Sequence, residues 1–182
     1  MLGYYALRLA LLPGIVLHEL SHYYFCRLVG AEIHEVCFFS FGHPAGYVIH
    51  TAPRRFRAHC VIAMGPLLIN SVAAVALFVA AIGTWRELAA LDPIDWAPGV
   101  LRLAAASWLG LVAALQALPS SGDAVSLWQV AKWHLRRGNV VAAVAYPIAL
   151  TIQLTNWLRQ VWVDWLFTGV LVWCAFRLTQ LR

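Results

Sequence analysis

Charged residues are scarce in this chain. Only 12% of its 182 residues are Asp, Glu, Lys or Arg, whereas 62% are hydrophobic. Three long stretches, 58–85, 103–122 and 138–158, contain no Asp, Glu, Lys or Arg at all. Each is near or above the roughly 20 residues that a helix needs to cross a bilayer. This composition excludes an ordinary soluble domain and predicts an integral membrane protein.

The chain is expected to fold as one all-α membrane domain over residues 1–182. Five membrane-spanning helices are predicted, at 2–29, 58–85, 100–118, 139–158 and 161–178. The first is interrupted by Arg8 and by a polar motif, and the last is short and carries Asp164 near its start. A removable signal peptide is not expected, because the first apolar stretch has no basic region before it.

Cysteine is also rare, and its spacing excludes a Cys-based zinc site. The four cysteines, Cys26, Cys37, Cys60 and Cys174, do not form the closely spaced pairs that such sites use. If the five helices alternate in direction, all four cysteines fall on one side of the membrane. We expect reduced thiols, because that side is predicted to be cytoplasmic.

The basic residues predict the orientation. Alternation of five helices places one group on a single side: Arg27, Arg54, Arg55, Arg57, Lys132, Arg136, Arg137, Arg177 and Arg182. The other side receives Arg8, Arg86, Arg102 and Arg159. The positive-inside tendency then puts the N-terminus outside and the C-terminus in the cytoplasm, as in a bacterial-type inner (plasma) membrane. The net charge of +5 is explained by contacts with anionic lipid headgroups, without a nucleic acid partner.

Two segments between the predicted spanning helices have a different residue pattern. Residues 32–51 contain two extended-looking apolar runs on either side of a Gly- and Pro-containing turn, which is typical of a β-hairpin. Their alternation is imperfect, so a loop lying on the membrane is an equal alternative. Residues 123–137 are more polar and have apolar residues at near-helical spacing. They predict an interfacial amphipathic helix.

The first predicted helix contains a His-Glu-x-x-His motif. His18 and His22 are four residues apart and project from one face of a helix, so their two imidazoles can hold one Zn²⁺. Glu19 is then placed to act as a general base on a water molecule. Ionisable groups in a membrane segment are costly and usually face a bundle interior or a wet cavity. The alternative is a trio of solvated polar residues at a helix end.

A catalytic zinc site normally has three protein ligands, so a third ligand is needed besides the two histidines. Asp123 is the best candidate, because it follows the third predicted helix at the same membrane depth as His18 and His22. Its alternative role is to cap the helix that follows, which Asp after Gly does well. The other acids lie in the polar loop or on the opposite side of the membrane.

Taken together, these residues resemble the site-2 protease family of intramembrane zinc metalloproteases. The resemblance covers roughly residues 8–130 and rests on His18-Glu19-x-x-His22, on Gly65-Pro66 with Asn70, and on the turn from Pro119 to Asp123. It implies a three-helix core formed by the helices at 2–29, 58–85 and 100–118. It also implies zinc bound by His18, His22 and Asp123, with Glu19 activating water.

The family pattern also suggests substrate contacts. Its usual Asn, four residues after the Gly, is replaced here by Ile69, and Asn70 comes one residue later. The Asn that precedes Pro in the family is Gln116 here. We therefore take Asn70, Gln116, Gly65 and Pro66 as candidates for substrate binding or for shaping the site.

The expected function is hydrolysis of peptide bonds in membrane-spanning proteins or peptides near the cytoplasmic face. A second hypothesis is a catalytically inactive, protease-like subunit that acts as a scaffold in a larger membrane complex. It rests on the nine tryptophans, several of which surround the last two predicted helices. A transporter or channel is a weaker alternative, because polar Gln153 and Asn156 occur in the fourth helix but no repeat supports it.

Overall fold

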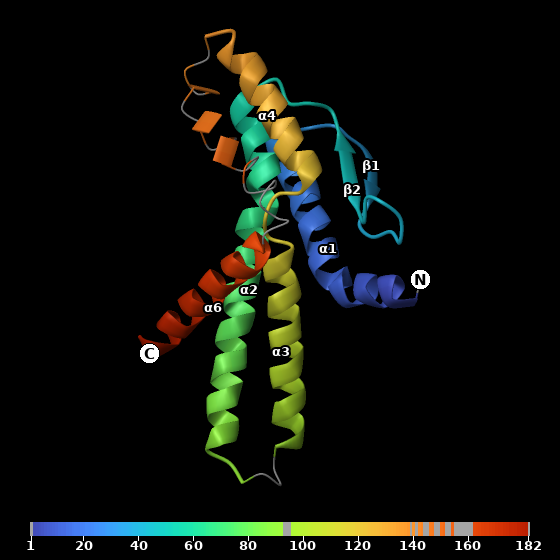
Figure 1. Cartoon of the computed structure of the whole chain (residues 1–182). Coiled ribbons are helices and arrows are strands. Elements are labelled where there is room, and N and C mark those ends of the chain that lie inside the picture. The colour runs from blue at the N-terminus through green and yellow to red at the C-terminus, as the bar shows by residue number, and fades with distance from the viewer. Residues whose placement is uncertain are drawn as a thin grey trace.

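The computed structural model describes residues 2–92, 96–138, 140, 142–143, 146–147, 150–151, 154 and 162–181. Within these ranges the chain forms five helices and one two-stranded sheet (Figure 1), namely α1 (Leu2–Val29), β1 (Ile33–Cys37), β2 (Tyr47–His50), α2 (Phe56–Ala89), α3 (Ala97–Leu115), α4 (Ser121–Leu135) and α6 (Val163–Gln180). The predicted mostly helical fold is therefore confirmed. The predicted helix at 139–158 falls largely outside the described residues.

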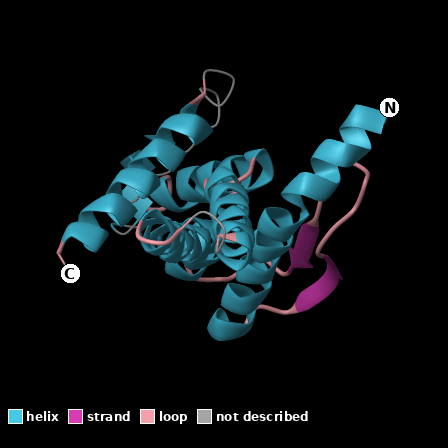
Figure 2. Ribbon diagram, turned by 90° about the horizontal axis from the view of Figure 1, so that it is seen from below, coloured by secondary structure: helices cyan, strands magenta, loops and turns pink. Residues whose placement is uncertain are grey.

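The segment after α1 is a β-hairpin and not a membrane-lying loop. β1 pairs with β2 in antiparallel fashion, with Val36 opposite Val48 and Cys37 opposite Tyr47. Figures 1 and 2 both show the hairpin beside α1. Its connecting loop is fixed to the first turns of α1, because the Tyr4 hydroxyl donates a hydrogen bond to the Phe41 carbonyl at 3.0 Å. The hairpin therefore stays against the helix that carries the His-Glu-x-x-His motif.

The centre of the fold is the antiparallel pair α2 and α3, seen nearly end-on in Figure 2. Small residues line their contact: Ala74 of α2 and Ala113 and Ala114 of α3 are almost completely buried. Gly110 of α3 faces the Phe78 ring so closely that a Cβ atom there would lie 2.9 Å from it. Small residues let two helices approach closely, which is how apolar helices pack without a strong hydrophobic drive.

Asn70 ties this pair to α1. Its side chain is completely buried, and its amide nitrogen lies 3.4 Å from the carbonyls of Gly14 and Ala113 and 3.1 Å from that of Gln116. These three carbonyls belong to α1, to α3 and to the residue just after α3. One buried side-chain amide thus donates hydrogen bonds to backbone carbonyls of three segments.

Two features of the helices were not expected from the sequence. α1 bends along its length (Figure 1), and Pro13 lies within it, where a proline removes a helical hydrogen bond and kinks the helix. At the other end of the chain, Arg86 of α2 donates hydrogen bonds to the Thr179 carbonyl at 2.9 Å and to its hydroxyl at 3.2 Å. The C-terminal ends of α2 and α6 therefore lie together.

The sides of the membrane predicted for the basic residues stay a prediction, to which this contact adds one observation. Alternation of five helices put Arg86 and the C-terminus on opposite sides, whereas Arg86 binds a carbonyl at the C-terminal end of α6. A guanidinium is favourable there because the last carbonyls of a helix carry partial negative charge. Among the described residues, only α2 and α3 are both long and apolar enough to cross a membrane.

We expect Asn70→Ala to lower the free energy of unfolding by roughly 1–3 kcal/mol, because it removes the donor that Gly14, Ala113 and Gln116 share. Ser71→Ala is the matched control. The Ser71 hydroxyl has no hydrogen-bond partner within the described part of the chain, so its removal should cost nothing. Thermal unfolding of the purified variants in detergent measures both. Equal melting temperatures for the two variants would contradict this role of Asn70.

Candidate metal centre

The two histidines of α1 are oriented by backbone carbonyls. His18 Nδ1 lies 2.7 Å from the Gln116 carbonyl, and His22 Nδ1 lies 3.0 Å from the Ile62 carbonyl. A carbonyl only accepts hydrogen bonds, so each Nδ1 must carry the proton. In each neutral imidazole, Nε2 is then left with a lone pair, which is the form that binds a metal.

Both carbonyls are available because a helical hydrogen bond is missing at each of them. In an uninterrupted helix the Ile62 carbonyl would accept from the backbone nitrogen four residues later, but that residue is Pro66, which has no N–H. Gln116 is the C-cap of α3, and the Ser120 N–H binds Asp123 instead of continuing the helix. The imidazoles therefore take hydrogen bonds that the helices themselves leave unmade.

Two glycines bring the helices close enough for these contacts. A Cβ atom on Gly14 would collide with the Val112 carbonyl, so the backbones of α1 and α3 touch one turn before His18 and Gln116. A Cβ atom on Gly65 would collide with the Phe25 ring, which packs α1 against α2 three residues after Ile62. The packing role that the sequence suggested for Gly65 thus has a structural basis.

Asp123 is held by the start of α4. Ser120 is the N-cap, its hydroxyl accepts the Asp123 N–H at 3.2 Å, and Asp123 Oδ2 accepts the Ser120 N–H at 2.8 Å. Asp123 thus forms a capping box with Ser120 and is not itself the N-cap. The same Oδ2 lies 3.3 Å from His22 Nε2 and 3.6 Å from His18 Nε2. Asp123 therefore caps α4 and faces both histidines at the same time.

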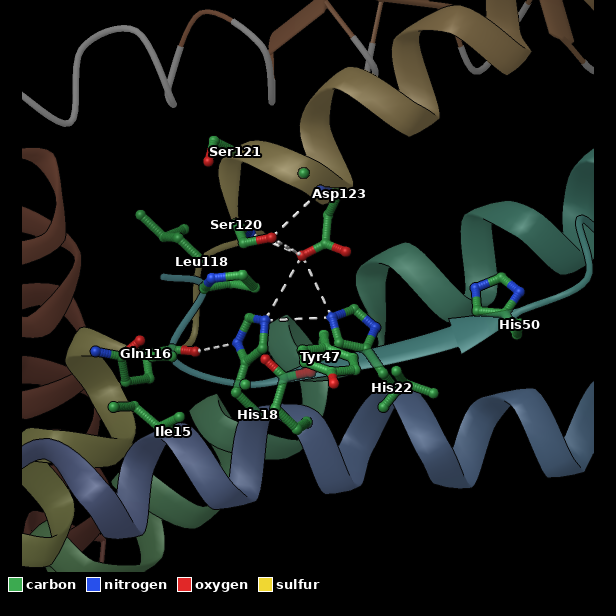
Figure 3. A pocket seen from close by; sticks show the side chains of 16 residues that line it. Ile15, His18, His22, Tyr47, His50, Gln116, Leu118, Ser120, Ser121 and Asp123 are labelled. Atoms are coloured by element: carbon green, nitrogen blue, oxygen red, sulfur yellow. Dashed lines mark hydrogen bonds and ion pairs between the residues drawn. The ribbon is translucent and has the colours of Figure 1, made fainter. Parts of the chain in front are cut away.

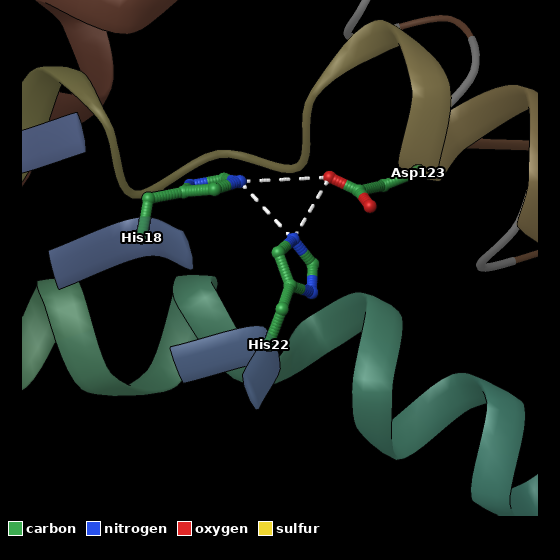
Figure 4. A group of neighbouring side chains, drawn as sticks. All are labelled: His18, His22 and Asp123. Carbon is green, nitrogen blue, oxygen red and sulfur yellow. Dashed lines mark hydrogen bonds and ion pairs between the residues drawn. The ribbon is translucent and has the colours of Figure 1, made fainter. Parts of the chain in front are cut away.

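Three potential ligand atoms meet at one point (Figure 4). His18 Nε2 and His22 Nε2 are 3.2 Å apart, and both face Asp123 Oδ2. Two imidazole lone pairs and a carboxylate repel one another unless a proton or a metal cation lies between them. Burial on its own raises the pKa of Asp123, but where a histidine Nε2 carries a proton, hydrogen bonding and positive charge from His18 and His22 outweigh that effect and hold the pKa well below its usual range. This buried group can hold a metal ion.

A cavity of about 330 Å³ opens onto this group (Figure 3). The half-buried Glu19 lines it beside the two histidines, and Gly46, just before β2, closes one wall. A Cβ atom on Gly46 would lie 2.6 Å from Glu19 Cγ, so only glycine permits this approach. A carboxylate outside the group of His18, His22 and Asp123 therefore lines the cavity.

The other predicted site residues fall in different places. Gln116 lines the cavity, and its carbonyl orients His18. Asn70, Gly65 and Pro66 are buried and are not among the residues that line the cavity. Their contacts give them structural roles, and substrate binding by any of the four stays a prediction.

Sequence reasoning missed several residues of this site. The role of Ser120 as an N-cap could have been predicted, because Ser-x-x-Asp before an apolar run is a capping-box pattern. His50 lines the cavity from β2, and the Ile62 carbonyl orients His22. Neither role has a sequence signature, since both depend on how the hairpin and α2 pack on α1.

Comparisons of the chain with protein-family models, with curated proteins and with solved structures found no match. The functional argument therefore rests on the geometry of the site.

Replacing any one of His18, His22 and Asp123 by Ala should lower metal affinity by more than the 10- to 100-fold typical of losing an outer-shell partner. His50→Ala is the closest control, because His50 lines the cavity outside the ligand group. Glu32→Ala and Glu35→Ala, in the hairpin region, should also bind metal normally. Elemental analysis after dialysis against buffered metal decides between these outcomes. Full occupancy in Asp123→Ala would remove Asp123 from the ligand set.

Pro66→Ala should move stability and metal affinity in opposite directions. The new Ala N–H can bond the Ile62 carbonyl and strengthen α2, but it competes with His22 for the same acceptor. We expect a higher melting temperature together with metal binding weakened about tenfold or more. Pro98→Ala, in the first turn of α3, restores no interior hydrogen bond and should change neither property. Unchanged metal affinity in Pro66→Ala would argue against this role for the proline.

Proposed function

We propose that this protein is a zinc-dependent peptidase that hydrolyses peptide bonds of membrane-inserted substrates. The observation that carries the proposal is the convergence of His18 Nε2, His22 Nε2 and Asp123 Oδ2 in a cavity lined by Glu19. Three ligands and one adjacent carboxylate are the groups that a zinc hydrolase needs.

The spacing of the three atoms supports zinc. Ligand atoms that lie about 2.0–2.1 Å from a tetrahedral zinc ion are separated from one another by about 3.3 Å. The separations here are 3.2, 3.3 and 3.6 Å. Two imidazoles and one carboxylate are also a ligand set found in zinc hydrolases. A zinc ion held there supplies a lowered pKa for water and polarises the carbonyl of the substrate.

Glu19 is proposed as the general base. It adjoins His18 in α1, lines the same cavity, and belongs to no metal-ligating group among the described residues. In the proposed reaction its carboxylate takes a proton from the attacking water and later donates a proton to the leaving amine. Gly46 keeps the cavity wall close to this side chain, which limits where the carboxylate can move.

The hairpin is proposed to hold the substrate. β2 residues Tyr47, Val48 and His50 line the cavity, and β2 has only one paired edge in the two-stranded sheet. A helical substrate hides its peptide bonds, so it must unwind before hydrolysis. An extended segment could then pair with the hairpin edge and present its carbonyl to the site.

Membrane insertion is proposed from exposed apolar surface. Only 17% of the apolar window of α2 and 28% of that of α3 is buried, whereas a core helix of a soluble protein would be mostly covered. Large apolar side chains such as Leu68, Val72 and Leu101 point outward from these helices. We place the start of α2, which carries Arg54, Arg55 and Arg57, in the cytoplasm.

The scaffold hypothesis also has an observation in its favour. Trp162, Trp165 and Trp173, in α6 or at its N-cap, are exposed and could contact a partner subunit. A membrane interface would also accommodate them, because tryptophan is enriched there. The two functions differ in whether the chain needs Glu19.

Glu19→Gln should abolish hydrolysis while zinc stays bound. The substitution keeps the size of the side chain and removes its basicity, so cleavage of a helical membrane peptide should fall by about 10²- to 10⁴-fold. Glu32→Gln, outside the cavity lining, is the matched control and should retain activity. Both variants are assayed in proteoliposomes with zinc content measured in parallel. Wild-type protein that binds zinc but cleaves no unwound membrane peptide would favour the scaffold.

A further inference from the structure

Two basic segments that are far apart in the sequence meet at one end of the molecule. Arg54, Arg55 and Arg57 flank the start of α2, and Lys132, Arg136 and Arg137 surround the end of α4. The Phe56 and His134 rings lie 5.5 Å apart, which joins the two segments. All six cations are exposed. We call this group the cationic end.

α4 is fixed against α2 by a buried apolar contact. Phe56 and Ala63 of α2 pack in one cluster with Leu127 and Ala131 of α4. Lys132 follows Ala131 directly, so the cations project from a part of α4 that packing holds in place. The cationic end is therefore built by the tertiary structure and not by one flexible basic run.

No acidic residue neutralises these cations locally. The chain has eight acids, and none lies between residues 36 and 86 or between 124 and 163. Within the described residues, no ion pair involves any of the six. Six exposed positive charges are therefore available to an anionic partner from outside the chain.

The end of α4 adds aromatic groups to this charge. The Arg137 guanidinium lies 3.5 Å from the centroid of the Trp133 ring, and the Lys132 ammonium lies 5.6 Å from that of Trp128. Lys132, Trp133, Arg136 and Arg137 line a hollow together with Gln129. Guanidinium groups bind phosphate oxygens in a fork, and indole rings favour the headgroup level of a bilayer.

The position of the cationic end favours lipid phosphates over a nucleic acid as its binding partner. Arg57 immediately precedes the uncharged stretch 58–85 of α2, so it marks the boundary of the segment proposed to cross the membrane. Lipid phosphates are found at this level. A nucleic acid would have to approach the same charges past the headgroups.

We propose that the hollow at the end of α4 binds the headgroup of an anionic phospholipid, with Arg54, Arg55 and Arg57 extending the contact across the membrane surface. The proposal rests on the proposed membrane insertion and is independent of the proposed hydrolysis. Each basic residue near an anionic surface contributes about fivefold in binding, so three substitutions in the hollow should weaken it by roughly a hundredfold.

Native mass spectrometry of the full chain in detergent tests this, with phosphatidylglycerol as the anionic probe and phosphatidylcholine as the zwitterionic one. Wild-type protein should bind phosphatidylglycerol at least tenfold more tightly. The variant Lys132→Gln/Arg136→Gln/Arg137→Gln should lose this preference. Arg177→Gln is the matched control, because Arg177 is also exposed and lies over a tryptophan, Trp173, in α6. It should behave as wild type.

A second variant keeps the test independent of folding. Arg136→Lys/Arg137→Lys preserves charge and should keep most of the lipid preference, and unchanged metal content in all variants reports an intact metal centre. Inorganic phosphate at the same concentration should not displace the lipid. Equal binding of the two lipids by wild type, a preference retained by the triple Gln variant, or displacement by phosphate would each overturn the proposal.

Discussion

The two hydrogen bonds from His18 and His22 to backbone carbonyls are the interactions on which the site depends. They fix the proton on Nδ1 of both rings, and they turn both Nε2 atoms toward one point 3.2 Å apart. The capping box of α4 places Asp123 Oδ2 at the same point, where a bound cation would relieve the repulsion among three electron-rich atoms. The convergence of these three atoms is thus a consequence of how the helices present their backbone groups.

α2 organises most of this arrangement. Pro66 frees the Ile62 carbonyl for His22, and Asn70, one turn further along, binds the Gln116 carbonyl that orients His18. The start of the same helix packs on α4, which carries Asp123. One apolar helix therefore supports both histidines and the carboxylate, which explains why a proline and a buried amide are tolerated within it. Both would cost stability in an isolated helix.

α4 connects the metal centre with the cationic end. Asp123 is in its first turn and Arg136 is its C-cap, so the two lie about 20 Å apart along the helix. The capping box holds the first turn, and the contact between Phe56 and His134 holds the last. A headgroup bound at the far end would therefore lie against the same helix that carries Asp123.

Much of the local structure could be predicted from the sequence, because it depends on short-range periodicity. The four-residue spacing of His18 and His22, the two strands around the turn, and the apolar stretch of α2 are all visible without coordinates. Asp123 could be matched to the histidines by depth alone. The orientation of the rings could not be predicted, because it depends on backbone carbonyls that any residue type carries.

Only the tertiary structure decided which of those carbonyls were free and which helices met. Helix interruptions at Pro66 and Gln116 became histidine partners only because Gly14 and Gly65 let α1 approach α3 and α2 closely. The hydrogen bond between Arg86 of α2 and the Thr179 carbonyl of α6 likewise has no signature in the sequence. Residue patterns determine which side chains share a helix face, whereas the contacts between helices depend on close backbone approach, which one-dimensional spacing does not encode.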